Sequence, residues 1–425
     1  MTHYGLMCPA STGHWNTMLP LGKELQQRGH RVTLIGVLDA QPKAQAAGLE
    51  FQIIGESEFP QGSAKASFDK LGELSGQEAL KYTINLLTQG TIVNLKYAPT
   101  AIKEAGIQAL LIDQVTSEGG TIADVSGLPF ITICSAVVLN RETSVPPFMT
   151  NWFYNPAWWV KLRNKLGYQL LNRLTQPITK VVDDYRLEKN LPVFSSPNQR
   201  YSQLAQISQQ PAEFEFPRTK LPECFHFTGP YHSPIGREVA DFPFDKLTGQ
   251  PLIYASMGTL QNRLLPVFQK IAAACQDLDA QLVISLGGSA DPEVLQGLPG
   301  NPLVVRYAPQ LQLLEKAALT ITHAGLNTTL ECLTNGVPMV AIPVANDQPG
   351  VASRIVWSGC GEAIPVKKVN VDNLQVAINK VLTEDSYRKN ALRLQAAIQK
   401  AGGVKRAIDI VEQAVSTGKP VLALK

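Results

Sequence analysis

Short apolar runs alternate with segments of helical spacing over the first 136 residues of the chain. Apolar positions in residues 16–29 recur at helical spacing, and Gly29 ends this segment. Another helix is expected over residues 118–126. The runs that predict buried strands are HYGLMCPA (3–10), HRVTLIGVL (30–38), QALLIDQ (108–114) and PFITICSA (129–136). Buried strands that alternate with helices predict a parallel sheet covered by helices on both faces.

The middle of the chain departs from this alternation. Residues 140–225 are rich in aromatic residues and proline, and we interpret them as mostly helical and irregular. Residues 228–250 carry glycine, proline and turn residues without a clear period, which is typical of an interdomain linker.

The alternation restarts at residue 251 and predicts a second α/β domain. Its expected helices cover about 262–276 and 326–335, and the tail from residue 372 onward is helical. Its expected strands are PLIYASMGT (251–259), QLVISLG (281–287), PLVVRYAP (302–309), ALTITHAG (318–325) and PMVAIPV (338–344). Two α/β domains joined by a linker form a cleft, and open α/β sheets bind ligands beyond the carboxyl ends of their strands.

Composition narrows the class of protein. The chain has 425 residues, 44% of them hydrophobic and 17% charged, which is typical of a globular protein with more than one domain. A formal net charge of +3 is too small to indicate nucleic acid as the main partner. Six scattered cysteines without a CxxC motif, no signal-peptide pattern and no long apolar run predict a cytoplasmic protein, with contact at a membrane surface left open.

Residues 322–348, THAGLNTTLECLTNGVPMVAIPVANDQ, place polar side chains in an apolar, glycine-containing run. His323 follows an expected strand, Gly325 permits a tight turn, and a helix begins near Asn327. A helix N-terminus offers free N–H groups and a partial positive charge, which suit a phosphate. Glu331 lies one turn further, where a carboxylate can accept hydrogen bonds from ribose hydroxyls. Taken singly, these residues are equally consistent with helix caps, core positions or a solvated helix face.

The stretch from Tyr307 to Gln348 resembles the donor-binding signature of family 1 UDP-sugar glycosyltransferases, which have the GT-B fold. This resemblance implies two Rossmann-like parallel-sheet domains that face each other across a cleft. The implied divisions are an acceptor domain at 1–230, a linker at 231–250, a nucleotide-sugar domain at 251–403 and a C-terminal helix and tail at 404–425 that crosses back to the first domain.

The same resemblance implies a set of donor-binding residues. Tyr307 would stack on the uracil, the Ala308 backbone would bind its edge, and a nucleotide sugar would be the co-substrate. The remaining implied contacts are Gln310 and Glu331 for the ribose, His323, Asn327 and Thr328 for the phosphates, Asp347 and Gln348 for the hexose, and Gly13, Ser256, Gly258, Thr259, Gly325 and Leu326 elsewhere on the donor. Plant members have Trp at the positions of Tyr307 and Leu326, so the chain resembles the bacterial branch, and uridine and thymidine donors both stay open.

His14 and Asp113 are the candidate catalytic residues. The segment STGHWNTMLPLGKELQQRGHRVT (11–33) resembles the N-terminal segment of the family, and His14 follows the first expected strand while Asp113 ends another. An alcohol becomes a good nucleophile only when it loses its proton, and a histidine oriented by a carboxylate can act as the base. Without this context, His14 is equally consistent with a loop or cap residue and Asp113 with a strand-end turn.

The implied reaction is a single inverting displacement that requires no metal ion. The spacing of Asp277 and Asp279 is that of a metal-binding acid pair, but both fall near the end of an expected helix, and we interpret them as a solvated helix terminus.

The acceptor side is expected in residues 143–182, which contain no Asp or Glu but several aromatic and basic residues. We predict that Trp15, Phe148, Trp152 and Phe153 line an apolar acceptor pocket. Alternatively, residues 158–175 contact an anionic membrane surface or form an ordinary packed helix with a basic outer face. The segment ANDQPGVASRIVWSGCGEAI (345–364) is similar to bacterial enzymes that glucosylate hydroxylated carotenoids such as zeaxanthin.

The predicted function is transfer of a hexose, glucose from UDP-glucose, to a hydroxyl of a lipophilic small molecule such as a hydroxylated carotenoid, a flavonoid or another polyphenol. The protein is expected to act as a monomer. Two alternatives stay open: a nucleotide-sugar epimerase, which needs no acceptor, and a non-catalytic nucleotide-sugar-binding protein. The presence of both His14 and Asp113 argues against the second.

Overall fold

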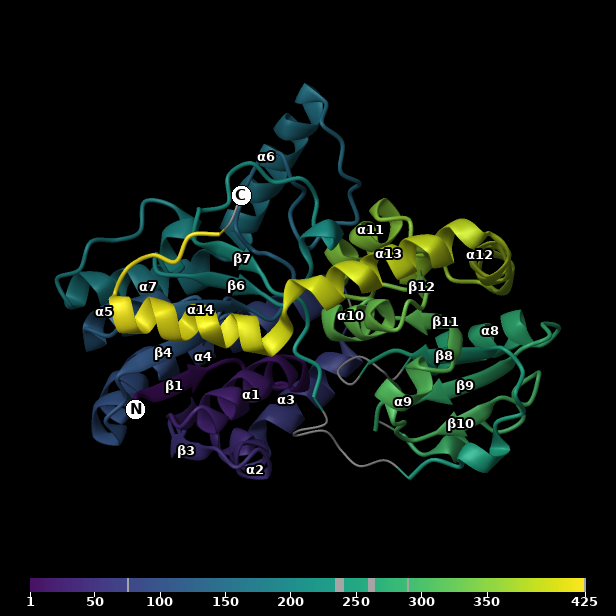
Figure 1. Ribbon diagram of the computed structural model, residues 1–425, viewed down its shortest axis with the longest axis horizontal. Coiled ribbons are helices and arrows are strands. Elements are labelled where there is room, and N and C mark those ends of the chain that lie inside the picture. The colour runs from purple at the N-terminus through teal and green to yellow at the C-terminus, as the bar shows by residue number, and fades with distance from the viewer. Residues whose placement is uncertain (75, 234–240, 259–263, 289, 424–425) are drawn as a thin grey trace.

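The computed structural model describes residues 1–74, 76–233, 241–258, 264–288 and 290–423. Within them the chain forms two parallel sheets side by side, each with helices on both faces (Figure 1). The first sheet has the strand order β3-β2-β1-β4-β5-β6-β7 and the second β10-β9-β8-β11-β12-β13. The predicted α/β class with two parallel-sheet domains is therefore confirmed.

The strands form where the sequence carries short apolar runs, and most strand residues are buried, as a sheet covered on both faces requires. The strands of the first sheet are β1 His3–Met7, β2 Arg31–Gly36, β3 Glu50–Ile53, β4 Ala109–Asp113, β5 Phe130–Cys134, β6 Gln206–Ser208 and β7 Phe225–Phe227. Those of the second are β8 Leu252–Ser256, β9 Gln281–Ser285, β10 Leu303–Val305, β11 Ala317–Thr322, β12 Met339–Ala341 and β13 Gly361–Ala363.

The helices cover these sheets in two groups. The first group is α1 Thr12–Gln27, α2 Gln41–Ala46, α3 Ser63–Glu73, α4 Gly76–Ala105, α5 Gly119–Ser126, α6 Trp158–Leu174 and α7 Gln176–Glu188. The second is α8 Leu265–Cys275, α9 Gln310–Leu314, α10 Leu326–Thr334, α11 Gln348–Trp357, α12 Val371–Thr383 and α13 Asp385–Ala401. The last helix, α14 Gly403–Thr417, packs on the first half. No helix among the described residues combines the length and apolar character needed to cross a membrane.

Strand order reverses at the centre of each sheet. Both β2 and β4 pair with β1, and both β9 and β11 pair with β8. The loops that leave such a switch point diverge to opposite faces of the sheet and leave a crevice beyond the carboxyl ends of the strands. His14 follows β1 and His323 follows β11, so both candidate residues emerge at these crevices.

The interpretation of residues 140–225 as mostly helical and irregular is incomplete. Helices α6 and α7 lie there, but so does β6, and β7 begins at Phe225. Both strands have three residues, which is too short to produce an alternating pattern that can be recognised in the sequence. They extend the first sheet beyond β5.

The chain passes between the two halves twice. Tyr231 is buried in a core cluster of the first half and Phe242 in one of the second, while residues 234–240 lie outside the described residues. Helix α14, yellow in Figure 1, then lies along the first half beside α1. Its apolar side packs into the same core cluster as β1, and Arg28 donates hydrogen bonds to Asp409 and Glu412.

Candidate active site

A cavity of about 840 Å³ lies between the two halves of the molecule. Its lining includes residues that follow β1, β4 and β5 in the first half and β8, β11 and β12 in the second. The size is sufficient for a ligand larger than a single nucleotide. Its walls come from both switch points, so a molecule bound on one half lies against the other.

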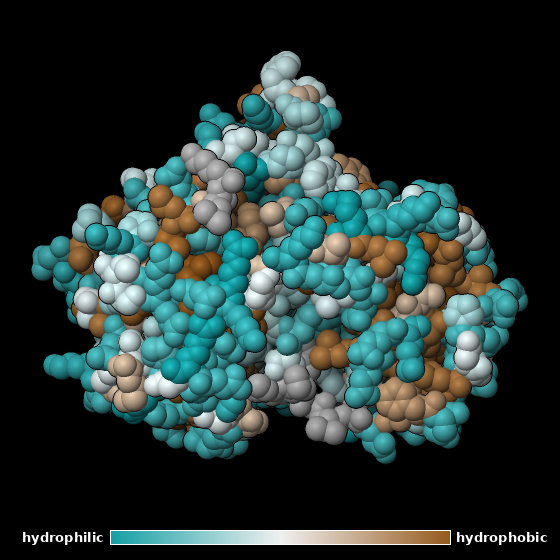
Figure 2. Space-filling view, viewed as in Figure 1, coloured by the Kyte–Doolittle hydropathy of each residue, from teal (hydrophilic) through white to brown (hydrophobic). Residues whose placement is uncertain are grey.

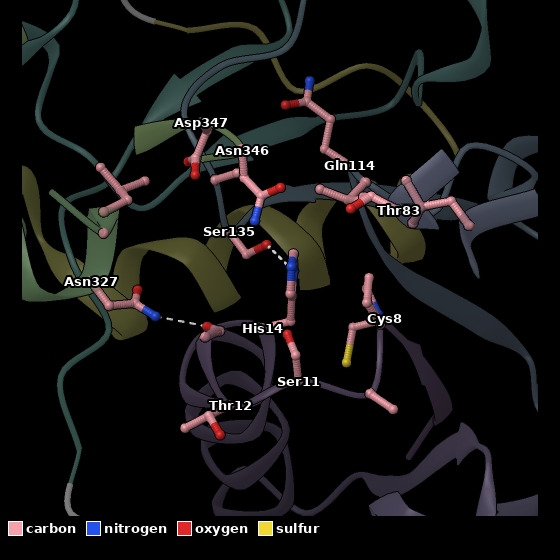
Figure 3. Close-up of a pocket in the computed structure, with 18 of the residues that line it drawn as sticks. Cys8, Ser11, Thr12, His14, Thr83, Gln114, Ser135, Asn327, Asn346 and Asp347 are labelled. Atoms are coloured by element: carbon pink, nitrogen blue, oxygen red, sulfur yellow. Dashed lines mark hydrogen bonds between the residues drawn. The ribbon is translucent and has the colours of Figure 1, made fainter. Parts of the chain in front are cut away.

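His14, Asp113 and Ser135 form a hydrogen-bonded group at the first-half wall. The Nδ1 atom of His14 lies 2.7 Å from Oδ2 of Asp113 and 2.8 Å from Oγ of Ser135, the contact drawn in Figure 3. The Ser135 hydroxyl also donates to Asp113 Oδ2. The Val115 backbone N–H donates to the other carboxylate oxygen and fixes its orientation. Nδ1 is thus engaged, and Nε2 is the ring nitrogen available to accept a proton.

The surroundings of His14 adjust its basicity. Burial by itself would lower the pKa of His14, but the negative charge and the hydrogen bond of Asp113 outweigh burial, so the pKa is raised. Asp113 is fully buried, whereas 22% of the His14 side chain is exposed. A buried carboxylate behind a partly exposed imidazole is the arrangement of an oriented general base.

Gln310 and Glu331 lie together at the second-half wall. Gln310 Nε2 donates to Glu331 Oε2, and Gln310 Oε1 accepts from the Tyr254 hydroxyl at 3.2 Å. Glu331 is almost fully buried yet lines the cavity. The cavity also contacts Tyr307 and Ala308, the residues expected at the base. These residues can therefore meet one nucleoside.

His323 lies in close contact with two glycines. A Cβ added to Gly258 or to Gly325 would come within 2.5 Å of His323 Nε2, so only glycine fits at either position without displacing the ring. Burial lowers the pKa of His323 to about 4, so the imidazole is neutral near neutral pH. A neutral imidazole can donate one N–H to a phosphate oxygen. Ser256 lines the cavity nearby, and Thr259 lies outside the described residues.

Asn327 joins the two halves. Its Nδ2 donates to the Gly13 carbonyl oxygen at 2.7 Å, as Figure 3 shows, and its Oδ1 accepts from Gln209 Nε2 at 2.8 Å. Helix α10 begins at Leu326, so the first backbone N–H groups, through Thr328, have no carbonyl partner within the helix. The backbone of this helix start can bind an anion while the Asn327 side chain holds the opposite wall.

Asp347 and Gln348 lie at the start of α11 and line the same cavity. Asp347 Oδ2 accepts from the Val137 backbone N–H at 3.3 Å, which connects it to the first half. Burial raises the pKa of Asp347, and its charge contributes to the raised pKa of His14. Gln348 Oε1 accepts from the N–H groups of Val344 and Ala345. Its amide nitrogen is thereby directed away from that loop.

Of the four residues predicted to line the acceptor pocket, the structure places one in the cavity wall. Phe148 lines the cavity, but Trp15, Trp152 and Phe153 are not among the residues that line it. Trp15 is 9% exposed and packs in the core of the first half, because the face of α1 that carries it covers the sheet. The Arg163 guanidinium stacks over the Trp152 ring, and Phe153 is 59% exposed. The apolar lining comes instead from residues of α3, α4, α6 and α7 such as Phe68, Leu71, Leu80, Ile84, Leu87, Leu171, Leu174 and Ile178.

Two residues of the site were not predicted from the sequence: Ser135, which lines the cavity, and Gln209, which is buried behind the wall and donates to Asn327. Each follows a strand of the first sheet, Ser135 after β5 and Gln209 after β6. Ser135 can be recognised in the sequence, because it directly follows the apolar run of β5, the strand that pairs with the one ending in Asp113. Gln209 cannot be recognised in this way, because the strand before it has only three residues and no pattern that identifies it.

Within the described residues, no group of three or more His, Cys, Asp or Glu side chains is arranged to hold a metal ion. Asp277 and Asp279 are exposed beyond the end of α8, as expected of a solvated helix terminus. The cysteines are all unpaired thiols.

Comparison with known proteins extends these observations. The family model described as UDP-glucoronosyl and UDP-glucosyl transferase matches residues 5–410. Zeaxanthin glucosyltransferase of Pantoea ananas is 31% identical over 100% of this chain and 98% of its own length, and that of Pseudescherichia vulneris is 29% identical over 99% and 100%. The crystal structure of the kitacinnamycin glycotransferase superimposes with a TM-score of 0.76 at 22% identity, over 97% of this chain and 98% of that one. The chain therefore belongs to the UDP-glucoronosyl and UDP-glucosyl transferase family and has the GT-B fold of a glycosyltransferase.

Proposed function

We propose that the protein is an inverting glucosyltransferase that moves glucose from UDP-glucose to a hydroxyl of a lipophilic small molecule, with a hydroxylated carotenoid as the first candidate. Family membership already gives transfer of a sugar from a nucleotide-sugar donor to a small-molecule acceptor. The proposal adds the sugar, the base, the stereochemistry and the acceptor class.

The observation that supports the proposal most is the position of His14, which is hydrogen-bonded to the buried Asp113, in the wall of the same cavity as Tyr307, Glu331 and His323. His14 Nε2 takes the proton of the acceptor hydroxyl, and the resulting oxygen attacks the anomeric carbon from the face opposite to the leaving group. The bond between that carbon and the diphosphate oxygen breaks as the new bond forms. The imidazolium that results is stabilised by Asp113.

The leaving diphosphate is held by the second half. The N-terminal backbone N–H groups of α10 and the neutral imidazole of His323 donate hydrogen bonds to its oxygens as negative charge develops there. Asp347 and Gln348 bind hydroxyls of the sugar, and Glu331 with Gln310 binds the ribose. This scheme requires no metal ion.

Two observations support a lipophilic acceptor. The part of the cavity in the first half includes an apolar wall formed by side chains of α3, α4, α6 and α7. Two relatives that match over nearly the whole chain, at 31% and 29% identity, are zeaxanthin glucosyltransferases, whose named acceptor is a hydroxylated carotenoid. A flavonoid or another polyphenol is the second acceptor class to test.

A panel of donors and acceptors tests the proposal. The protein is incubated with UDP-glucose, UDP-galactose, UDP-N-acetylglucosamine or thymidine-diphospho-glucose, with and without zeaxanthin, a flavonol or a sterol, and products are identified by mass spectrometry. We expect UDP release that depends on zeaxanthin and a product heavier by one hexose, both lost in His14→Ala. Turnover of UDP-glucose without any acceptor would favour an epimerase instead. UDP-sugar binding without turnover of any donor would contradict the proposed transfer.

A further inference from the structure

The outer face of α6 carries an apolar stripe that nothing in the described chain covers. Trp158, Leu162, Leu166 and Leu170 are spaced by four residues, which places them along one side of the helix. Together with Trp159 they are between 52% and 78% exposed. Figure 1 shows α6 projecting from the first half of the molecule, and Figure 2 shows hydrophobic and hydrophilic residues mixed at this apex.

The stripe is not needed to hold α6 in place. The opposite side of the helix buries Val160, Asn164 and Leu171 against the first half. Asn164 Nδ2 donates to the Thr143 carbonyl oxygen at 3.0 Å, and the Tyr168 hydroxyl donates to that of Val145. The helix therefore has two apolar sides, of which one is packed and the other open. Isolated exposed apolar residues are common, but a continuous row on one helix favours an interaction surface.

The charges beside the stripe have one sign. Residues 143–182 contain no Asp or Glu, and Lys161 and Lys165 immediately precede Leu162 and Leu166 in the sequence. Both lysines are exposed, and no acidic residue lies within a helical turn of either one. A helix with exposed tryptophan and leucine beside lysine is typical of a segment that lies in the interface of an anionic bilayer. In a symmetric dimer built on this face, the same positive charges would face each other, which disfavours a second copy as the partner.

The same helix also contributes to the acceptor part of the cavity. Leu171 and Leu174 of α6 line it, together with Ile178 of α7. Residues that meet the proposed lipophilic acceptor and residues exposed on the outer face thus belong to one rigid element of 17 residues. This continuity connects the open stripe with the site.

We propose that α6 docks the protein on an anionic lipid bilayer, with Trp158 and the leucine stripe among the acyl-chain ends and Lys161 and Lys165 against the headgroup phosphates. Docking brings the cavity to the bilayer in which a lipophilic acceptor is dissolved. The role of docking in acceptor supply rests on the proposed function, whereas the docking itself does not.

Flotation of the full chain with vesicles tests the docking directly. We expect binding to equimolar phosphatidylglycerol and phosphatidylcholine, weaker binding to phosphatidylcholine alone, and a decrease with added salt. The double variants Leu162→Ser with Leu166→Ser and Lys161→Glu with Lys165→Glu should each weaken binding to the mixed vesicles by about tenfold or more. These side chains are exposed, so the variants should keep the thermal midpoint of the parent.

Matched variants in the second half serve as controls. Val294→Ser with Val376→Ser removes exposed apolar side chains, and Lys367→Glu with Lys368→Glu reverses two exposed lysines. Neither should change vesicle binding. Equal binding by the parent and both α6 variants, or no binding by the parent, would overturn the proposal. A dimer by light scattering that the leucine variant dissociates would overturn it as well, because α6 would then be an interface between copies.

Activity assays separate this inference from the proposed function. Transfer to an acceptor dispersed in detergent micelles should be unchanged in the α6 variants, whereas transfer to the same acceptor embedded in anionic vesicles should fall in parallel with binding. Vesicle binding that depends on α6 without any glucosyl transfer would refute the proposed function and leave the docking intact.

Discussion

Replacement of Asp113 by asparagine removes the charge behind His14 and keeps the shape of the side chain. The asparagine oxygen can still accept from the Val115 N–H, which now donates to Asp113 Oδ1 at 2.9 Å. The amide NH2 then takes the place of Oδ2 opposite His14 Nδ1 and cannot accept a hydrogen bond. The change therefore removes the charge that stabilises the imidazolium and the acceptor that holds the proton on Nδ1. We expect Asp113→Asn to lower kcat strongly and to leave the KM for UDP-glucose nearly unchanged, because Asp113 lies on the half opposite to the nucleotide-binding residues.

The size of the effect follows from the geometry. A contact of 2.7 Å between Nδ1 and Oδ2 places the centres of the two charged groups about 4 Å apart, where an effective dielectric constant of about 20 gives roughly 4 kcal/mol of attraction. At about 1.4 kcal/mol for each factor of ten, kcat should fall about 10³-fold. This agrees with the roughly 10²–10⁴-fold that general base catalysis contributes.

The pH profile gives a second readout. His14 must be neutral to act as a base, so activity rises as the pH rises through its pKa. Asp113 raises that pKa, and its replacement should therefore move the acidic limb of kcat/KM to lower pH. Initial rates are followed by UDP release with zeaxanthin as acceptor, and Asp372→Asn, an exposed carboxylate on α12, is the control. A variant with the parental kcat, or with an unshifted acidic limb, would refute this account of His14.

Three further changes test the rest of the site and the contact between the halves. His323→Ala should weaken UDP binding roughly 10–100-fold by calorimetry at neutral pH, where the imidazole is neutral, since a hydrogen bond to a charged group is lost. Gly258→Ala should weaken UDP binding by a similar factor, because the added Cβ displaces His323. The control Gly297→Ala should not weaken it, because Gly297 also has a positive φ but no atom lies within 4 Å of an added Cβ. Equal effects of the two changes would point to backbone strain alone. Arg354→Met should lower the free energy of unfolding in urea by about 1.5–3 kcal/mol, because the buried Glu215 carboxylate loses its hydrogen bonds from Arg354 and keeps only Arg218 and Gln210 as side-chain partners. Burial would raise the pKa of Glu215, but the charges of Arg354 and Arg218 outweigh burial and lower it. The ionised Glu215 therefore stabilises the parent above the pKa that this carboxyl has in the unfolded chain, and the stabilisation is lost as the pH falls through its pKa in the folded protein. A loss of stability below about 1 kcal/mol in the variant would contradict this reading.

The second half was predictable from sequence because its local signals agree. Buried strands there carry uninterrupted apolar runs, and the glycine, histidine and helix start at residues 323–327 follow one of them directly. When the sequence neighbours of each residue explain its role, the motif can be recognised without knowledge of the tertiary contacts. The α/β class of this half and the family were accordingly predictable.

The acceptor side was less predictable because it depends on contacts distant in sequence. Trp15 was expected in the acceptor pocket, but its position on α1 directs its side chain into the core of the first half. The apolar wall contains residues of α3 and α4, which carry no distinctive motif. Gln209 could not be identified because its strand, Gln206–Ser208, is held by neighbours β5 and β7 and not by its own sequence.

The configuration of the product tests the central claim most directly. UDP-glucose carries its glucose in the α configuration, and a single displacement with His14 as base must invert it. The protein is supplied with UDP-glucose and zeaxanthin, and the anomeric proton of the purified glucoside is examined by nuclear magnetic resonance. The account predicts a β-glucoside, formed with one UDP for each glucose transferred and lost in His14→Ala. An α-glucoside, or a β-glucoside formed equally well by His14→Ala, would contradict it.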